Sequence, residues 1–165
     1  MSTILNTNGD SLLIPELNKK VAGKFYVVTA EWNSDITYAL RDGALDVLRK
    51  AGLEDKKIKC VSVPGTVELV NAAALIAHGG DAAAVIVIGT VIRGDTPHFD
   101  YVCQIAAQGT ALINAEGKTP VIFGVLTVDN LAQAQERAGG ILGNKGAEAA
   151  VAAIQMANIH TQFWL

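Results

Sequence analysis

Short apolar runs that alternate with helical patterns constrain the fold of this chain more than any other feature. The runs lie at residues 24–30 (KFYVVTA), 57–63 (KIKCVSV), 83–89 (AAVIVIG) and 120–127 (PVIFGVLT). Their length and their β-branched residues are typical of buried strands, and the third run, the most apolar, is expected at the centre of the sheet. Strands joined by helices pair in parallel, with helices on both faces. The sequence therefore predicts an α/β fold, a three-layer α/β/α sandwich around a parallel four-stranded sheet.

Helical periodicity fills the intervals between these runs. The first helix is expected to begin at a cap, Asn33 or Ser34, and to end before Gly52. Its apolar residues recur at helical spacing between those limits. Further helices are expected at residues 67–80, 98–115, 130–139 and 144–159, with glycines separating the last two.

Length and composition favour one domain that associates with copies of itself. With 165 residues the chain suits a single domain, which we expect over residues 23–165. Residues 1–22 have weak periodicity and are expected to form an N-terminal arm with one short strand near Ser11–Ile14. Only 18% of the residues are charged, below the roughly 25% typical of soluble domains. Association between subunits would hide the extra apolar surface; the alternative is an alanine-rich monomer.

Charge and composition argue against a nucleic-acid-binding, secreted, membrane-spanning or metal-binding protein. The net charge is −3 and no block of Lys and Arg occurs, which argues against a nucleic-acid partner. The N-terminus has no signal pattern and no apolar run reaches the roughly 18 residues of a membrane span, so we expect a cytoplasmic protein. Cys60 and Cys103 are expected to be small core residues, and the histidines lack the spacing of metal ligands.

Polar and aromatic residues gather where the expected strands end. Ligands of open parallel sheets bind beyond the carboxyl ends of the strands. The chemistry is therefore expected at residues 32–33, 64–68, 89–98 and 127–129. The third segment is the richest, because it gathers Arg93, Asp95, Thr96 and His98. It is not a nucleoside-triphosphate loop, since Asp95 stands where such a loop has lysine. The Thr96 hydroxyl and backbone N–H groups at the next helix start can still hold one phosphate.

Several side chains near these strand ends suit a small phosphorylated reactant with a planar partner. His98 follows a proline near a helix start and can exchange a proton near pH 7, or else only caps the helix. Glu68 can accept hydrogen bonds from a polyol or amine, or only stabilise its helix start. Trp32 can stack on a planar ring or serve as a hydrophobic lid. Arg137 and Lys145 are either solvated charges or, for Arg137, a forked phosphate donor.

The motifs EWNSDIT, VPGTVEL, GTVIRGDTPHFDYV, PVIFGVLT, AQERAG and GNKG, in this order, resemble those of the lumazine synthase family. The resemblance covers residues 23–158, and it implies a flavodoxin-like sheet. It also implies the penultimate enzyme of riboflavin biosynthesis. That enzyme condenses 5-amino-6-(D-ribitylamino)uracil with 3,4-dihydroxy-2-butanone 4-phosphate, giving 6,7-dimethyl-8-ribityllumazine and phosphate. No metal or organic cofactor is implied.

The same resemblance implies a role for each candidate residue. Trp32 would stack on the pyrimidine ring, Glu68 would accept hydrogen bonds from the ribityl chain, and His98 would relay protons. The pyrimidine and ribityl site would be bordered by Thr66, Val67, Thr90, Val91 and Ile92. The phosphate would be held by Gly94, Asp95 and Thr96.

The family's site lies between subunits, so the resemblance also implies partners. A neighbouring subunit would contribute Phe123 over the ring and Arg137 at the phosphate, and Lys145 would add positive potential. The family forms pentamers, some of which build sixty-subunit icosahedral shells; the N-terminal strand can add to a neighbour's sheet, and riboflavin synthase is a further implied partner.

Trp32 stands where many members have phenylalanine, and Val67 replaces a common aromatic. These differences leave open a non-catalytic flavin-binding or shell-forming paralogue. A phosphosugar enzyme with convergent loops is a third hypothesis.

Overall fold

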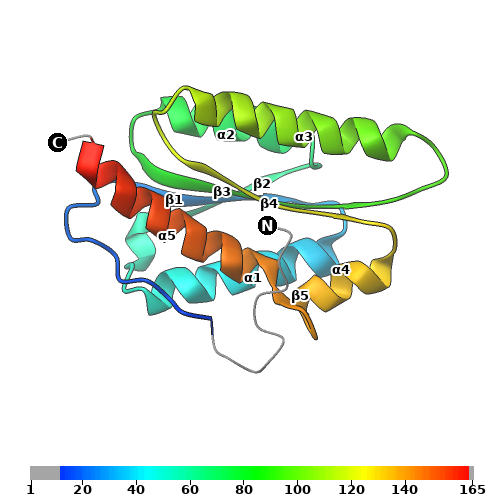
Figure 1. Cartoon of the computed structure of the whole chain (residues 1–165), viewed down its shortest axis with the longest axis horizontal. Coiled ribbons are helices and arrows are strands. Elements are labelled where there is room, and N and C mark those ends of the chain that lie inside the picture. Colours follow the sequence, from blue (N-terminus) through cyan, green and yellow to red (C-terminus); the bar gives the residue numbers. More distant parts are fainter. Residues whose placement is uncertain (1–11, 164–165) are drawn as a thin grey trace.

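A computed structural model of the chain describes residues 12–163. In it, a parallel four-stranded sheet lies between two layers of helices (Figure 1). The elements in chain order are β1 (Lys24–Ala30), α1 (Ser34–Lys50), the 3-10 helix η1 (Asp55–Lys57), β2 (Ile58–Val63), α2 (Glu68–His78), β3 (Ala82–Ile92), α3 (His98–Ala115), β4 (Val121–Val128), α4 (Leu131–Arg137), β5 (Ala138–Gly140), β6 (Gly143–Asn144) and α5 (Lys145–Phe163). The predicted α/β/α sandwich, with its flavodoxin-like parallel sheet, is confirmed.

The four strands lie in the order β2-β1-β3-β4, and every neighbouring pair is parallel. β3 is therefore an inner strand, as predicted from its apolar sequence. It continues to Ile92, beyond the expected end at Gly89, because Thr90, Val91 and Ile92 stay in register with the last three residues of β4. This extension carries the chain to the edge where the polar loops lie.

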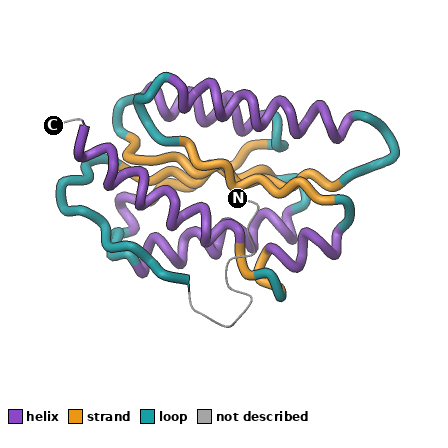
Figure 2. The backbone as a smooth tube through the Cα atoms, in the orientation of Figure 1, coloured by secondary structure: helices purple, strands orange, loops and turns teal. Residues whose placement is uncertain are grey.

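Each face of the sheet has its own hydrophobic core. Phe25, Val27 and Ile86 face α1 and α5, whereas Val28 and Val87 face α2 and α3. Alternate residues of a strand point to opposite faces, so a strand covered on both sides is apolar without interruption. Figure 2 shows α2 and α3 together on one side of the sheet and α1, α4 and α5 on the other.

α1 and α5 approach closely, at a position where α5 has no side chain. A Cβ on Gly146 would collide with the backbone of Leu40, so glycine is needed there. Asn144, the residue before α5, reinforces this contact. Its amide donates to the carbonyl of Ala39 at 2.9 Å, and its Oδ1 accepts from the N–H groups of Gly146 and Ala147. The GNKG motif thus caps one helix and joins it to another.

Cys60 does not belong to the core, contrary to expectation. It is exposed, whereas Cys103 is half-buried, and both cysteines are free. Cys60 lies on β2, and β2 is an edge strand whose middle residues face water. Ser62, two residues further on and therefore on the same face of the strand as Cys60, was the available signal for an exposed face.

The two ends of the chain differ in detail from the prediction. The strand expected near Ser11–Ile14 is not present over its described part; Leu12 and Ile14 instead pack on the α1/α5 core without regular structure, and Ser11 lies outside the described residues. A strand needs a hydrogen-bonding partner, and pairing with a neighbouring subunit stays a prediction. The glycines between α4 and α5 form the antiparallel β5–β6 hairpin, and α5 extends to Phe163 rather than residue 159. None of the helices between residues 12 and 163 has the length and hydropathy needed to cross a bilayer.

Candidate active site

A pocket of about 410 Å³ opens at the carboxyl ends of the inner strands, beside the starts of α2 and α3. Its lining consists of Trp32, Asn33, Thr66, Val67, Glu68, Thr90, Val91, Ile92, His98 and Val102. All of these except Asn33 and Val102 are residues that the sequence singled out as site residues. Parallel strands bring their carboxyl ends to one edge, which is why segments far apart in sequence meet here. The fourth expected segment, residues 127–129, does not line the pocket.

Trp32 forms one wall of this pocket. Its side chain is 68% exposed, unusually high for an indole. A Cβ on Gly65 would lie 2.7 Å from Cε3 of Trp32 and 3.0 Å from Oε2 of Glu68. Only a glycine at that position leaves room for both the ring and the carboxylate. The result is an accessible flat aromatic surface with an acceptor beside it, suited to a planar ligand that carries hydroxyl groups.

Asn33 fixes the turn that carries Trp32. Within the described residues it is the only non-glycine with a positive φ, 58°. The side chain does not cap α1 as predicted, and Nδ2 instead donates to the carbonyl of Thr90 at 3.0 Å. Asparagine tolerates the left-handed region better than most residues. The hydrogen bond ties the end of β1 to the end of β3 beneath the pocket.

Three polar side chains of the pocket, unlike that of Asn33, form no hydrogen bond within the described residues. Glu68 and His98 are the first residues of α2 and α3, and neither side chain hydrogen-bonds or forms an ion pair within residues 12–163. The Thr90 hydroxyl is buried without a hydrogen-bond partner among the described residues. Because buried polar groups are nearly always paired in folded proteins, groups left free at a pocket are candidates to bind a ligand.

The loop between β3 and α3 provides free backbone donors next to the pocket. Gly94, Asp95 and Thr96 follow the lining residue Ile92 and precede the lining residue His98. Their N–H groups donate to no carbonyl of the described chain, and a Cβ on Gly94 would meet nothing within 4 Å. Free N–H groups directly before a helix N-terminus form a site that favours an anion.

Phe123, Arg137 and Lys145 do not line the pocket of their own chain. Phe123 lies in the middle of β4 and packs against the α2/α3 core. Arg137 ends α4 and donates to the carbonyl of Gln133 at 2.9 Å. Lys145 begins α5, and its ammonium lies 2.7 Å from the buried carboxylate of Glu148. The roles expected for these three residues therefore require a second subunit.

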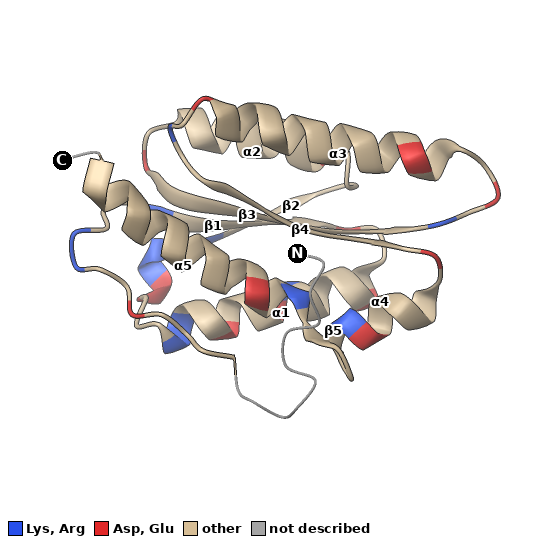
Figure 3. Ribbon diagram, viewed as in Figure 1, with Lys and Arg blue, Asp and Glu red and all other residues tan. Residues whose placement is uncertain are grey.

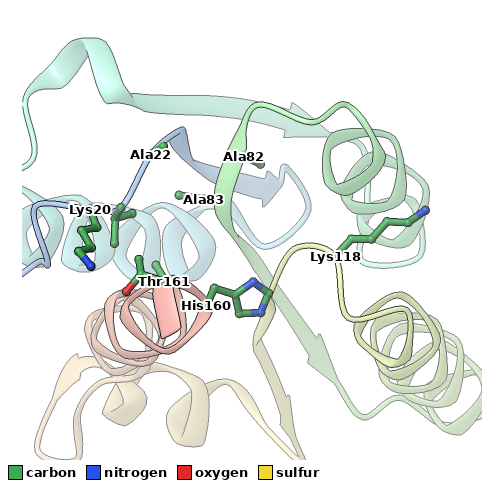
Figure 4. A pocket seen from close by; sticks show the side chains of 9 residues that line it. Lys20, Ala22, Ala82, Ala83, Lys118, His160 and Thr161 are labelled. Atoms are coloured by element: carbon green, nitrogen blue, oxygen red, sulfur yellow. The ribbon is translucent and has the colours of Figure 1, made fainter. Parts of the chain in front are cut away.

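A second cavity, of about 200 Å³, lies at the opposite, amino-terminal end of the sheet (Figure 4). Its basic residues do not converge on one point. The side chain of Lys118 extends away from His160, while Lys20 lies on the other side, near Thr161 (Figure 4). Lys118 instead approaches Glu116, at 3.5 Å. The three basic side chains therefore do not form one common anion site.

The chemistry open to the first pocket is binding and proton transfer. It offers an aromatic face, a carboxylate, an imidazole and the adjoining backbone donors. Cys103 does not line it, and burial raises the pKa of that thiol, which disfavours the nucleophilic thiolate. In the part of the chain that the structure describes, no three His, Cys, Asp or Glu side chains are grouped to hold a metal ion.

Comparison with known proteins gives a consistent result. A model of the 6,7-dimethyl-8-ribityllumazine synthase family matches residues 22–161. The protein of that name from Phocaeicola vulgatus is 51% identical over 133 residues, 81% of this chain and 79% of that protein. Its namesake from Bacteroides fragilis is 50% identical over 133 residues, 81% of this chain and 93% of that protein. The one from Porphyromonas gingivalis is 52% identical over 133 residues, 81% of this chain and 83% of that protein.

Proposed function

The chain belongs to the 6,7-dimethyl-8-ribityllumazine synthase family, and on this premise we propose that the pocket beside Trp32 is its active site. There the enzyme, a transferase of riboflavin biosynthesis, condenses 5-amino-6-(D-ribitylamino)uracil with 3,4-dihydroxy-2-butanone 4-phosphate. The products are 6,7-dimethyl-8-ribityllumazine and phosphate. One observation carries the proposal: an aromatic wall, an unpaired carboxylate and an unpaired imidazole line the same pocket.

The ribitylaminouracil occupies the apolar part of the pocket. Its ring stacks on the exposed indole of Trp32, and its ribityl hydroxyls donate to the carboxylate of Glu68, which as an anion can only accept. Further contacts come from Thr66 and Val67 and from the end of β3, Thr90, Val91 and Ile92. The unpaired Thr90 hydroxyl is one hydrogen-bonding group that this substrate can satisfy.

The phosphorylated substrate binds at the loop before α3. The free N–H groups of Gly94, Asp95 and Thr96, together with the Thr96 hydroxyl, surround the phosphate, and the α3 dipole favours its charge. The carboxylate of Asp95 points away from the phosphate. Arg137 of a neighbouring subunit supplies the forked cation. Phe123 of that neighbour covers the ring, and Lys145 adds positive potential.

Alignment of the two reactants is the main catalytic contribution. An amine of one reactant attacks a carbonyl of the other, water leaves as the imine forms, phosphate is eliminated, and a second amine closes the ring with loss of water. Holding the two molecules together replaces a bimolecular encounter. His98 relays protons between these steps and contributes roughly 10²–10⁴-fold.

The site is complete only in an assembly, and a homo-oligomer follows. We expect a pentamer, with a sixty-subunit icosahedral shell as the larger alternative and riboflavin synthase as a partner. In this arrangement residues 23–165 form one catalytic domain, residues 1–22 are its N-terminal arm, and addition of the N-terminal strand to a neighbour's sheet stays a prediction. The expected location is the cytoplasm.

The test is to incubate the protein with both purified substrates and to monitor formation of the lumazine by its fluorescence. Wild-type protein should form product, and His98→Ala should reduce kcat by roughly a hundredfold without abolishing it, since alignment of the substrates survives. His160→Ala, at the far end of the sheet, is the matched control and should keep full activity. Absence of product from the wild type, where a known synthase turns over, contradicts the proposal.

The second candidate, a non-catalytic flavin-binding paralogue, is motivated by Trp32 and Val67. Riboflavin is titrated against tryptophan fluorescence in a Trp164→Phe background, so that Trp32 alone reports. Tight quenching without lumazine formation favours this candidate, whereas turnover with weak quenching rejects it. Analysis of the reaction product excludes a phosphosugar enzyme at the same time.

A further inference from the structure

Arg93 is the charged residue of the β3–α3 loop that the substrate contacts above do not use. Its guanidinium nevertheless has three partners within the chain. Nε donates to Oδ1 of Asp129 at 2.9 Å, Nη1 approaches Oδ1 of Asp100 at 3.4 Å, and Cζ lies 4.0 Å from the centre of the Phe99 ring. The bond to Asp129 is the main reason that the pKa of Arg93 is raised. These contacts hold the side chain against the protein.

Arg93 connects the residues before and after the free N–H groups of Gly94–Thr96. Arg93 precedes Gly94–Thr96, whereas Phe99 and Asp100 lie in the first turn of α3, just after them. One side chain therefore joins both ends of the loop. The backbone N–H of Arg93 also donates to the carbonyl of Val128 at 2.9 Å, which ties the near end to β4.

Asp129 extends this connection to the next loop. It follows β4 directly, and its N–H donates to the side chain of Gln133 in the first turn of α4. Asn130 caps the same helix through its own side chain. The Arg93–Asp129 pair thus links the β3–α3 loop to a β4–α4 turn that has side-chain hydrogen bonds of its own.

We propose that Arg93 is a positioning residue that holds the Gly94–Thr96 loop in the shape that binds the phosphate of the second substrate. This role rests on the proposed function. Two carboxylates already compensate the guanidinium, so the cation for the phosphate comes from elsewhere. A fixed loop favours binding because the ordering of its backbone does not have to accompany ligand binding.

The test is Arg93→Lys in the assembled enzyme. Lysine keeps the charge but loses the planar fork and the stacking on Phe99. We expect KM for the phosphorylated substrate to rise about tenfold, the scale of one lost charge-assisted hydrogen bond. KM for the ribitylaminouracil should stay within about twofold, because Trp32 and Glu68 are untouched. The Kd of inorganic phosphate, measured by calorimetry without turnover, should rise in parallel with the first KM.

Two further variants sharpen the result. Asp129→Asn keeps an acceptor but removes the negative charge that strengthens the hydrogen bond to Arg93, and it should weaken phosphate binding in the same direction, with less than additive effects in the double variant. Arg41→Lys is the matched control. Arg41 stacks on Tyr38 at 4.4 Å and donates to Asp42 at 2.9 Å, but it lies on α1, and its substitution should change neither KM.

Three outcomes overturn the inference. The first is an unchanged phosphate Kd and KM in Arg93→Lys, with wild-type turnover intact. The second is an equal rise in both KM values, which indicates general loss of structure. The third is tighter phosphate binding in Asp129→Asn, which indicates that a released Arg93 contacts the phosphate itself. Absence of lumazine from the wild type is a different failure, because it contradicts the proposed function.

Discussion

The two helix layers cover the sheet alike on the inside and differ on the outside. Charges of both signs on α1 and α4 reach the solvent, and the two charges of α5, Lys145 and Glu148, pair beneath the surface. In contrast, α2 and α3 contain two carboxylates, Glu68 and Asp100, and no Lys or Arg (Figure 3). Tyr101, Ile105 and Leu112 recur at helical spacing on α3 and are 64%, 46% and 71% exposed. An exposed apolar stripe of this kind indicates a missing partner.

The difference separates stability from assembly. In the α1/α5 layer the two helices pack on each other within one chain, with a glycine contact at Gly146 and charge pairs such as Lys50–Asp46 on the surface. The α2/α3 layer buries its sheet face, and we expect its exposed apolar outer face to contact a second copy of the chain. Its helix starts also provide Glu68 and His98 to the pocket. We therefore expect substitutions on the outer face of α3 to impair assembly, and substitutions between α1 and α5 to lower the free energy of unfolding.

The largest expected effect breaks the assembly. Ile105→Asp combined with Leu112→Asp places two carboxylates in the expected contact, where an unpaired charge is costly to bury. The molecular mass by light scattering should fall to that of a single chain, with the circular dichroism spectrum preserved. Lumazine formation should fall by more than about a hundredfold, because the pocket loses Arg137 and alignment of the phosphate.

The control for this variant lies on the other layer. Ile159→Asp introduces the same charge at an exposed position of α5 and should leave the mass unchanged. If the α3 variant keeps the wild-type mass, the outer face of α3 is not the contact. If the mass falls but activity persists, the site does not need a neighbour.

The next effect concerns stability alone. Gly146→Ala forces a methyl group against the backbone of Leu40, which cannot move without separating α1 from α5. We expect a loss of about 3 kcal/mol in the free energy of unfolding, at the upper end for overpacked cores. Urea unfolding measures it. Gly94→Ala, which adds the same group in open space, should change that free energy by less than about 1 kcal/mol. Equal effects in both variants would mean that the α1/α5 contact does not depend on glycine.

The strands and most helix limits follow from the sequence, because they depend on local periodicity. α1 and α3 run as predicted, and β1 has the predicted ends. The end of β3 was misplaced because Thr90 and its neighbours resemble a polar loop, and only pairing with β4 extends the strand. Cys60 was misassigned for a related reason, since the position of β2 at the sheet edge depends on strand order.

The pocket follows from the sequence because parallel strands bring their ends together. The hydrogen bonds that hold the loops around the pocket do not follow from the sequence, because they join residues that are far apart in the chain. Asn33 looks like a helix cap in the sequence, but it bonds Thr90, which lies 57 positions away. Arg93 lies in the loop where the sequence places the chemistry, but its guanidinium bonds Asp129, 36 positions away. In both cases an ordinary local role was available, and tertiary geometry gave the side chain another partner.

The smallest expected effect concerns a link inside the α2/α3 layer. Nδ1 of His78, at the end of α2, lies 2.6 Å from the carbonyl of Ala74, and Nε2 lies 2.7 Å from a carboxylate oxygen of Glu116, just after α3. A carbonyl and a carboxylate both accept, so these contacts favour the charged imidazole, in which both ring nitrogens donate. The bond to Ala74 and then Glu116 raise the pKa of His78, with nearby Lys118 opposing, and His78 lowers the pKa of Glu116.

The sign of the pH dependence follows from these two shifts. A raised histidine pKa stabilises the fold below the ordinary value of 6.5, and this is lost as pH rises through the folded pKa. A lowered glutamate pKa stabilises it above 4.5, and this is lost as pH falls through its folded pKa. The difference in melting temperature between wild type and His78→Gln should therefore be greatest near pH 5.5 and shrink toward pH 8.5. The difference should be small because the pair is exposed. In a Glu116→Gln background, the effect of His78→Gln on the melting temperature should depend less on pH. If the difference in melting temperature between wild type and His78→Gln instead grows with pH, the link acts as a neutral hydrogen bond.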